Sequence, residues 1–302
     1  MESQLKKIIK EISEERGYVL KTYSDDFILQ IINNDKVMFI YGYKFPNNNA
    51  SIEQICDDKA GLSSLLEYYN IPHIDHFYFY SKDPNAENFD DATWKKIYSL
   101  FNKYKKVVCK SNKGTGGRSV YKAETIEELK KAVEKIFNKE KSVCISPYHE
   151  IKEEYRVVVI NKEVIYIFKK VRPVVIGNGK DTICNLINQA EIKNLDCDQF
   201  DLNFIPEKGD LIQLTWKHNL GQGSKPELIT DQTMIDRITV IADNCARKLD
   251  LNFVSIDVID DGELKVLEIN SGVMIENFSK FSKEYYYLSK KAIERAIDEY
   301  FK

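Results

Sequence analysis

The residues best suited by type and spacing to do chemistry lie at positions 253–270, in the stretch FVSIDVIDDGELKVLEIN. Two apolar, strand-like runs flank Asp261-Gly262, a strong signal for a β-hairpin turn. A turn centred there predicts three cross-strand pairs: Asp257 with Val266, Ser255 with Glu268, and Phe253 with Asn270. Because side chains alternate along a strand, we expect Asp257, Glu268 and Asn270 on one face, about 7 Å apart across the ladder. The other face is expected to join the core through Val254, Ile256, Val258, Leu267 and Ile269.

Two carboxylates and a carboxamide on one sheet face are oxygen ligands of the kind that Mg²⁺ takes. This ion commonly uses one or two carboxylates and completes its shell with water and phosphate oxygens. The alternative is an ordinary solvated hairpin face, on which acidic residues are common. The hairpin by itself favours neither interpretation.

A glycine-rich stretch, VVCKSNKGTGGRSVYKA, supplies a second candidate. Glycines at 114, 116 and 117 leave backbone N–H groups free to approach an anion, and Lys110 and Lys113 add positive charge. The pattern GxxxxGK[ST] is absent and a strand follows the glycines, so this is no Walker loop. We predict a loop that covers phosphates between two strands, in preference to a plain hairpin turn.

The elements that must position these residues follow from apolar periodicity. Helices are expected at residues 2–16, 59–69, from Thr125, after Thr182 and at 231–248. Strands are expected within 18–43 and at 76–80, 106–110, 143–145, 155–160, 164–169 and 210–215. Residues 81–92 are polar and form the best candidate for a domain boundary.

Bulk composition narrows the classes of protein. The chain has 302 residues, with 43% hydrophobic and 30% charged, which is ordinary for a globular protein. A net charge of −3 gives no electrostatic case for a nucleic-acid or anionic-membrane partner. No signal peptide or membrane span is expected. Six cysteines without CxxC spacing indicate free thiols, and therefore a cytoplasmic protein.

Taken together, four segments resemble the ATP-grasp ligases, above all the ATP-grasp part of cyanophycin synthetases, the related glutathione-forming ligases and the ligases that add glutamate to proteins. The segments are VVCKSNKGTGGRSVYKA, EYRVVVINKEVIYIFKKVRPVVIGNGKDTICNLI, IPEKGDLIQLTWKHNLGQG and VSIDVIDDGELKVLEINSG. The likeness covers about residues 106–278 and, more weakly, 57–71. Each segment alone is a weak or moderate indication of this family, whereas the order and spacing of all four together are a strong one.

The resemblance implies an α/β (α+β) protein with the ATP-grasp fold, in which two α+β subdomains hold the nucleotide. An N-terminal α/β pre-ATP-grasp domain would occupy residues 1–90 and the ATP-grasp domain residues 91–302. Within the latter, residues 91–146 would form a lid-like subdomain and residues 147–302 the metal and substrate subdomain.

The resemblance also implies roles for individual residues. Nucleotide binding would involve Lys110, Gly114, Gly116, Gly117, the hinge Ser146-Pro147-Tyr148, Glu154 at the ribose and, as a weaker candidate, Lys59. The metal ligands would be Asp257, Glu268 and Asn270. Lys217 and Asn219 would lie near the γ-phosphate and acyl group, and Arg156 and Arg172 are candidates for a substrate carboxylate.

Other interpretations of these residues stay open. Arg156 and Arg172 are equally well explained as salt-bridge partners, Lys59 as part of a solvated helix face, and Glu150 and Glu153 compete with Glu154. The chain also departs from its relatives: Ser111 replaces a proline, Lys217 stands where many have arginine, and Ser271-Gly272 replaces a proline-glycine pair. These departures concern the acceptor site more than the metal ligands.

The implied activity is ATP- and Mg²⁺-dependent ligation, with Mn²⁺ as a substitute metal. A carboxylate would be activated as an acylphosphate and joined to an amine, with small amino acids or peptides as substrates. The alternatives are modification of a peptide or protein side chain and nucleotide binding without ligation. The sequence leaves a homodimer open and does not identify the donor or the acceptor.

Overall fold

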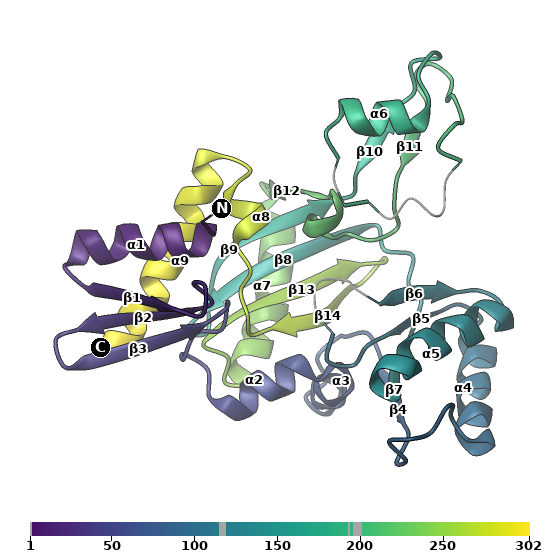
Figure 1. Cartoon of the computed structure of the whole chain (residues 1–302), viewed down its shortest axis with the longest axis horizontal. Coiled ribbons are helices and arrows are strands. Elements are labelled where there is room, and N and C mark those ends of the chain that lie inside the picture. The colour runs from purple at the N-terminus through teal and green to yellow at the C-terminus, as the bar shows by residue number, and fades with distance from the viewer. Residues whose placement is uncertain (1, 115–118, 193, 196–200) are drawn as a thin grey trace.

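The computed structural model describes residues 2–114, 119–192, 194–195 and 201–302. Its centre is a five-stranded antiparallel sheet in the order β12-β9-β8-β13-β14 (Figure 1). The strands are β8 (Glu153–Ile160), β9 (Glu163–Val171), β12 (Lys225–Leu228), β13 (Phe253–Asp260) and β14 (Leu264–Asn270).

One face of this sheet is largely apolar and belongs to a core. Val157, Val254 and Ile256 pack there against the buried side of α7 (Gln232–Lys248), as the alternation of the strands predicts. Helices α2 (Ala50–Asp57) and α3 (Lys59–Tyr68) extend the same core through Cys56, Leu62 and Leu66.

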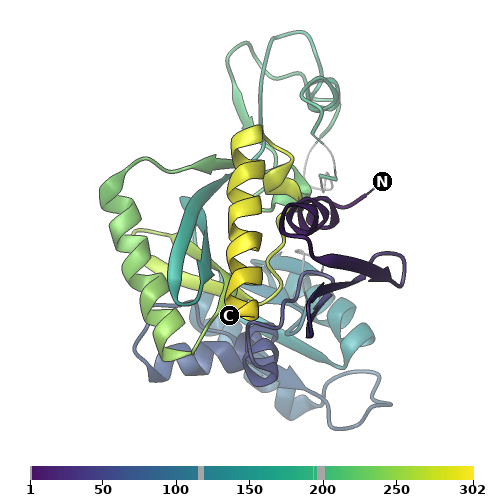
Figure 2. The same ribbon diagram turned by 90° about the vertical axis from the view of Figure 1, so that its left-hand side faces the viewer.

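The opposite face of the sheet is divided into an apolar part and a polar part. Val158, Ile160 and Phe253 pack with α1 (Gln4–Arg16) and α9 (Lys283–Phe301) in one core. Figure 2 shows α9 and α7 on opposite sides of the sheet. Further along the same strands the residues become charged, with Arg156 on β8 and Asp257 on β13. This charged part is left open for a site.

A second, four-stranded antiparallel sheet has the order β4-β7-β5-β6. Its strands are β4 (Phe77–Tyr80), β5 (Val107–Lys110), β6 (Val120–Ala123) and β7 (Ser142–Pro147). It shares a core with α4 (Asp91–Tyr104) and α5 (Ile126–Glu140). Thr125 and Glu128 cap α5 reciprocally, which fixes where the chain leaves β6 and becomes helical.

Two smaller units complete the fold. The N-terminal sheet contains β1 (Val19–Tyr23), β2 (Ile28–Asn33) and β3 (Lys36–Tyr41), and packs on α1 and α9. Strands β10 (Val174–Ile176) and β11 (Leu211–Gln213) with α6 (Ile183–Gln189) form a projection (Figure 1). The short helices are α8 (Glu276–Ser279) and the 3₁₀ turn η1 (Leu220–Gln222).

The mixed α/β fold expected from the resemblance is confirmed, with two α+β units facing each other. The domain boundary near residue 90 stays a prediction. The strand β4 precedes that boundary but pairs with β7 after it, so the chain crosses between units more than once. Helix α9, which the sequence analysis did not predict, shares its core with α1 from the other end of the chain. Within the described residues, no helix is both long and apolar enough to cross a membrane.

The predicted register of the β13–β14 hairpin was wrong. Asp257 pairs with Glu268 and Ser255 with Asn270, and the register shifts between Asp257 and Val258. The turn spans three residues, because Asp260 pairs with Leu264. The irregularity after Asp257 turns Leu267 toward the cavity described below, whereas Val266 is buried in the core. Leu267 had been expected on the core face.

Candidate active site

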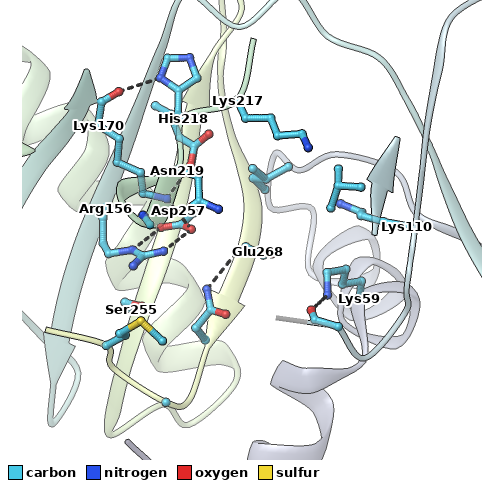
Figure 3. A pocket seen from close by; sticks show the side chains of 18 of the residues that line it. Lys59, Lys110, Arg156, Lys170, Lys217, His218, Asn219, Ser255, Asp257 and Glu268 are labelled. Atoms are coloured by element: carbon cyan, nitrogen blue, oxygen red, sulfur yellow. Dashed lines mark hydrogen bonds and ion pairs between the residues drawn. The ribbon is translucent and has the colours of Figure 1, made fainter. Parts of the chain in front are cut away.

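A cavity of about 710 Å³ lies where the two large sheets meet. The four-stranded sheet contributes Val108, Lys110, Val120 and the segment Ser146-Pro147-Tyr148. The central sheet contributes Glu154, Arg156, Lys170, Ser255, Asp257, Glu268 and Asn270. Residues 216–221 line it from the connection after β11. Figure 3 shows Lys110 and Lys59 on one side, and Asp257, Arg156 and Lys170 on the other.

The wall formed by the central sheet contains a buried cluster of four charges. Asp257 is 1% exposed, and its two carboxylate oxygens accept hydrogen bonds from Nε and an Nη of Arg156, both at 2.8 Å. Lys170 Nζ lies 2.7 Å from Asp257 and 2.5 Å from Glu154. Neighbouring antiparallel strands bring these residues together, since Arg156 on β8 is directly opposite Asp257 on β13.

Burial and charge act in opposite directions on the two acids of this cluster. Burial alone would raise the pKa of Asp257, but the positive charges of Arg156 and Lys170 hold that pKa well below its usual range. For Glu154, burial dominates and raises the pKa to about 7, because Lys170 is shared and Asp257 lies nearby. Asp257 is therefore a fixed anion, while Glu154 is the acid of this cluster that can take up a proton.

The predicted metal ligands lie on one face, as the alternation of β13 and β14 requires. Asp257 is opposite Glu268, and Asn270 Nδ2 donates to Glu268 Oε1 at 3.2 Å. Glu268 forms no ion pair with any described residue. Ser255, opposite Asn270, has a buried hydroxyl oxygen with no hydrogen-bond partner in the described part of the chain.

These residues fit an Mg²⁺ ion bound together with phosphate. Glu268 and Asn270 present oxygens to the cavity. Asp257 Oδ1 accepts only from Arg156 Nε among the described residues and keeps a lone pair, whereas Oδ2 accepts from both Arg156 and Lys170. The described residues contain no group of three or more His, Cys, Asp or Glu arranged for a metal. A site with two carboxylates needs ligand oxygens from a nucleotide, as Mg²⁺ sites commonly have.

Lys110 projects from the end of β5 on the opposite wall. It is 7% exposed and forms no ion pair with any described residue. Burial lowers the pKa of this lysine, and the negative charge of Glu268 partly opposes the shift. A buried ammonium without an ion-pair partner is costly, so its position in the cavity suits an anionic ligand. Gly114 also lines the cavity, whereas Gly116 and Gly117 lie outside the described residues.

Lys59 does not lie on a solvated helix face. Its ammonium donates to the carbonyl oxygens of Gly114 at 2.6 Å and Asn112 at 3.3 Å. The Asn112 side chain accepts from Ala60 N at 3.1 Å and donates to Asp58 at 2.9 Å. The start of α3 therefore holds the stem of the glycine loop. The sequence analysis did not single out Asn112, because its partners are more than 50 residues away.

The predicted hinge also lines the cavity. Tyr148 N donates to Lys106 O at 3.0 Å, and its ring meets Trp216 edge to face with 5.8 Å between centroids. Lys122 Nζ lies 4.8 Å from the centre of the same ring. Aromatic and aliphatic groups are therefore available here for a flat ligand such as a base.

The segment after β11 brings Lys217 and Asn219 to the cavity, as predicted. Asn219 Oδ1 accepts from Gly221 N at 2.8 Å and so caps η1. His218 was not predicted: its Nδ1 lies 2.7 Å from Lys170 O, and burial lowers its pKa to about 4. Arg172 is not among the described residues that line the cavity, and Arg156 is in the salt bridge that was the alternative to substrate binding.

Lys170 is the main residue of the site that the sequence analysis missed. A signal was present, because Lys169 and Lys170 are adjacent in a strand of otherwise apolar residues. Neighbouring strand residues point to opposite faces, so one of two adjacent lysines in a covered strand must point inward.

No family model matches the chain. It is 29% identical over 223 residues to the bifunctional glutathione biosynthesis protein of Clostridium perfringens, covering 66% of this chain and 28% of that protein. It is 23% identical over 193 residues to a cyanophycin synthetase of Trichormus variabilis, covering 56% of this chain and 21% of that protein. The chain thus spans less than a third of the length of these curated relatives.

Solved structures show the same fold. A bifunctional glutathione synthetase from Pasteurella multocida superposes with a TM-score of 0.58 at 16% identity, covering 96% of this chain and 44% of that one. A D-alanine–D-alanine ligase from Bacillus anthracis gives a TM-score of 0.53 at 17% identity, covering 82% and 69%. The chain therefore has the fold of the ATP-grasp ligases and resembles members of that superfamily in sequence.

Proposed function

We propose that the protein is an ATP- and Mg²⁺-dependent ligase that activates a carboxylate as an acylphosphate and joins it to an amine. One observation carries the proposal. Lys110, a buried cation without an ion pair among the described residues, faces a cavity whose other wall presents Glu268, a carboxylate that likewise has none. A nucleotide triphosphate with its metal supplies the missing partner of both.

The first step would be attack of a substrate carboxylate oxygen on the γ-phosphorus, with the bond to the β-phosphate oxygen breaking and ADP leaving. Lys110 and Lys217 would neutralise charge on the transferred group and hold it in line. Bound Mg²⁺, held by Asp257, Glu268 and Asn270, would supply Lewis-acid stabilisation of the phosphate oxygens. Arg156 and Lys170 would keep Asp257 ionised and oriented.

In the second step, an amine would attack the acyl carbon, lose a proton and expel inorganic phosphate, leaving an amide. The cavity wall must exclude water at this stage, because water would hydrolyse the acylphosphate. Gly114, whose carbonyl oxygen accepts from Lys59, lines the cavity and would be part of that wall. Substrates would be amino acids or small peptides, and the likeness to a glutathione biosynthesis protein and a D-alanine–D-alanine ligase supports this class.

The same fold supports two other functions. Modification of a peptide or protein side chain would use the same two steps with a larger substrate. Nucleotide binding without ligation would need no second substrate. A cytoplasmic setting is proposed from the thiols, since the described cysteines include five that are free and four of these are buried. A homodimer remains a prediction from the sequence.

Phosphate release tests the proposal directly. The protein is incubated with ATP, Mg²⁺ and a panel of amino acids and dipeptides, and products are identified by mass spectrometry. Glu268→Gln should abolish Mg²⁺-dependent release, while Glu263→Gln, in the exposed turn of the same hairpin, should leave it unchanged. Nucleotide binding without phosphate release under any amino acid or peptide would refute a ligase and favour the non-catalytic alternative.

A further inference from the structure

The N-terminal sheet has an apolar outer face. In an antiparallel sheet with one face on the core, the other face is usually polar. Here the inner face is buried through Leu29, Ile31, Met38 and Ile40, as expected. The outer face follows from the register of β1, β2 and β3, in which Val19, Ile32 and Val37 form one row and Tyr23, Ile28 and Tyr41 form another.

Large apolar groups on this face are open to solvent. Tyr41 is 62% exposed and Phe39, in the row between the other two, is 54% exposed. Polar groups on the face are few: the middle row adds Lys21 and Gln30 beside Phe39. A contiguous apolar patch of this kind commonly marks a binding surface.

The patch is continuous with the cavity. Phe27 and Tyr41 line the cavity and meet edge to face, with 4.8 Å between ring centroids. Gly42 N donates to Phe27 O at 2.8 Å, and the chain then runs through Lys44, which bridges to Gly272 just after Asn270. Tyr41 therefore belongs both to the patch and to the cavity lining, and Phe27 packs beside it at the cavity.

We propose that this outer face of β1, β2 and β3 binds an extended apolar segment of a polypeptide substrate whose reacting group enters the cavity. The proposal rests on the proposed ligase function and specifies its substrate class. Val37 is four residues from Tyr41, a distance of about 13 Å along a strand. A free amino acid cannot contact the distal row and the cavity together, whereas an extended segment of four or more residues can.

A second copy of the chain is the competing occupant. It would have to cover Phe27 and Tyr41, which line the cavity, and would therefore obstruct the route of the substrate. The edge of β3 is also engaged, because Tyr300 donates to Val37 O at 2.9 Å and Lys36 Nζ to Phe301 O at 3.0 Å. Recognition would then use side chains on the face more than backbone pairing along that edge.

The test uses two fluorescein-labelled hexapeptides, one with Val and Phe at alternate positions and one with Ser at those positions. Binding is measured by fluorescence polarisation in the presence of Mg²⁺ and ADP. The wild-type protein should bind the apolar hexapeptide at least tenfold more tightly than the serine version. Phe39→Ser should remove that preference, while Tyr287→Ser, at a position of equal exposure on α9, should retain it.

The proposal is overturned if the apolar hexapeptide does not bind preferentially, or if Phe39→Ser binds it as the wild type does. Sedimentation of both proteins tests the competing occupant: a wild-type dimer that becomes a monomer in Phe39→Ser, with peptide binding unchanged, assigns the face to a subunit interface. The wild type and Phe39→Ser could release phosphate equally with free amino acids while neither binds the peptide. That result would leave the ligase function intact and refute the docking face alone.

Discussion

Substitutions at Asp257 and Glu268, two carboxylates on one hairpin, should distinguish a residue that stabilises the fold and binds the proposed metal from one that serves the metal alone. Asp257→Asn and Glu268→Gln each replace one oxygen with an amide nitrogen, at positions directly opposite each other on β13 and β14. Both should abolish Mg²⁺-dependent phosphate release. They should differ sharply in their effect on the free energy of unfolding.

The difference follows from the contacts of each carboxylate. Asp257 is 1% exposed and balances the buried Lys170 and the half-buried Arg156, whose charges remain when that of Asp257 is removed. Removing one partner of a buried ion pair costs about 3–5 kcal/mol, which corresponds to a fall in melting temperature on the order of 10 °C for a chain of this size. Glu268 is half-buried and bonds Asn270, a contact that glutamine can keep, so its cost should stay within about 0.5 kcal/mol.

Thermal unfolding without ligand measures the loss of stability in each variant. Calorimetric titration with ADP, first with Mg²⁺ and then with a chelator, measures how much Mg²⁺ strengthens ADP binding and does not rely on activity. For Glu268→Gln, the gain in ADP affinity that Mg²⁺ provides should shrink at least about tenfold. An Mg²⁺-dependent gain that survives in Glu268→Gln would show that the metal assignment is wrong. A melting temperature as low as that of Asp257→Asn would refute the division of roles.

Three further predictions concern other residues of the site. Burial lowers the pKa of His218 to about 4, so the unfolded chain binds a proton at this histidine more tightly than the folded chain does. The free energy of unfolding should therefore be highest above pH 6.5 and should fall by roughly 3 kcal/mol as the pH drops toward 4. Urea unfolding at several pH values, with His218→Gln as the reference, would detect this loss. Lys110→Met should weaken ADP binding by at least about tenfold while unfolding no earlier on heating, since it removes a buried ammonium without an ion pair among the described residues; a large fall in melting temperature would contradict this. Asn112→Ala should cost about 1–3 kcal/mol in urea, because Asp58 and Ala60 N lose their partner, and should raise KM for ATP more than it lowers kcat; unchanged stability would argue against the proposed anchoring of the loop.

The face shared by Asp257, Glu268 and Asn270 could be predicted from the sequence although the register could not. The turn is one residue longer than Asp261-Gly262 indicates, and the irregularity after Asp257 adds another residue to β14. Together these two changes shift the pairing register by two residues, which is the period with which side chains alternate along a strand. The carboxylates therefore lie on the predicted face, although Glu268 is opposite Asp257 and not opposite Ser255 as predicted.

Contacts between distant segments were beyond this kind of prediction. Arg156 could be given two roles from the sequence, and only the adjacency of β8 and β13 decides that it pairs with Asp257. The hold of Lys59 on Gly114 likewise depends on α3 lying against the stem of the glycine loop. Local patterns identify which residues carry charge, whereas the order of strands determines which charges neutralise each other.

Within the buried cluster, Arg156 and Lys170 are balanced by Asp257 and by Glu154 when it is ionised, so these residues form a nearly neutral wall. Lys110 and Glu268 have no ion pair among the described residues and remain on opposite sides of the cavity, close enough that Glu268 affects the pKa of Lys110. A metal–triphosphate ligand presents phosphate oxygens to the lysine and a cation to the glutamate. The residues that the fold leaves unbalanced are therefore those that the bound nucleotide would satisfy, which is why their substitution should reduce binding more than stability.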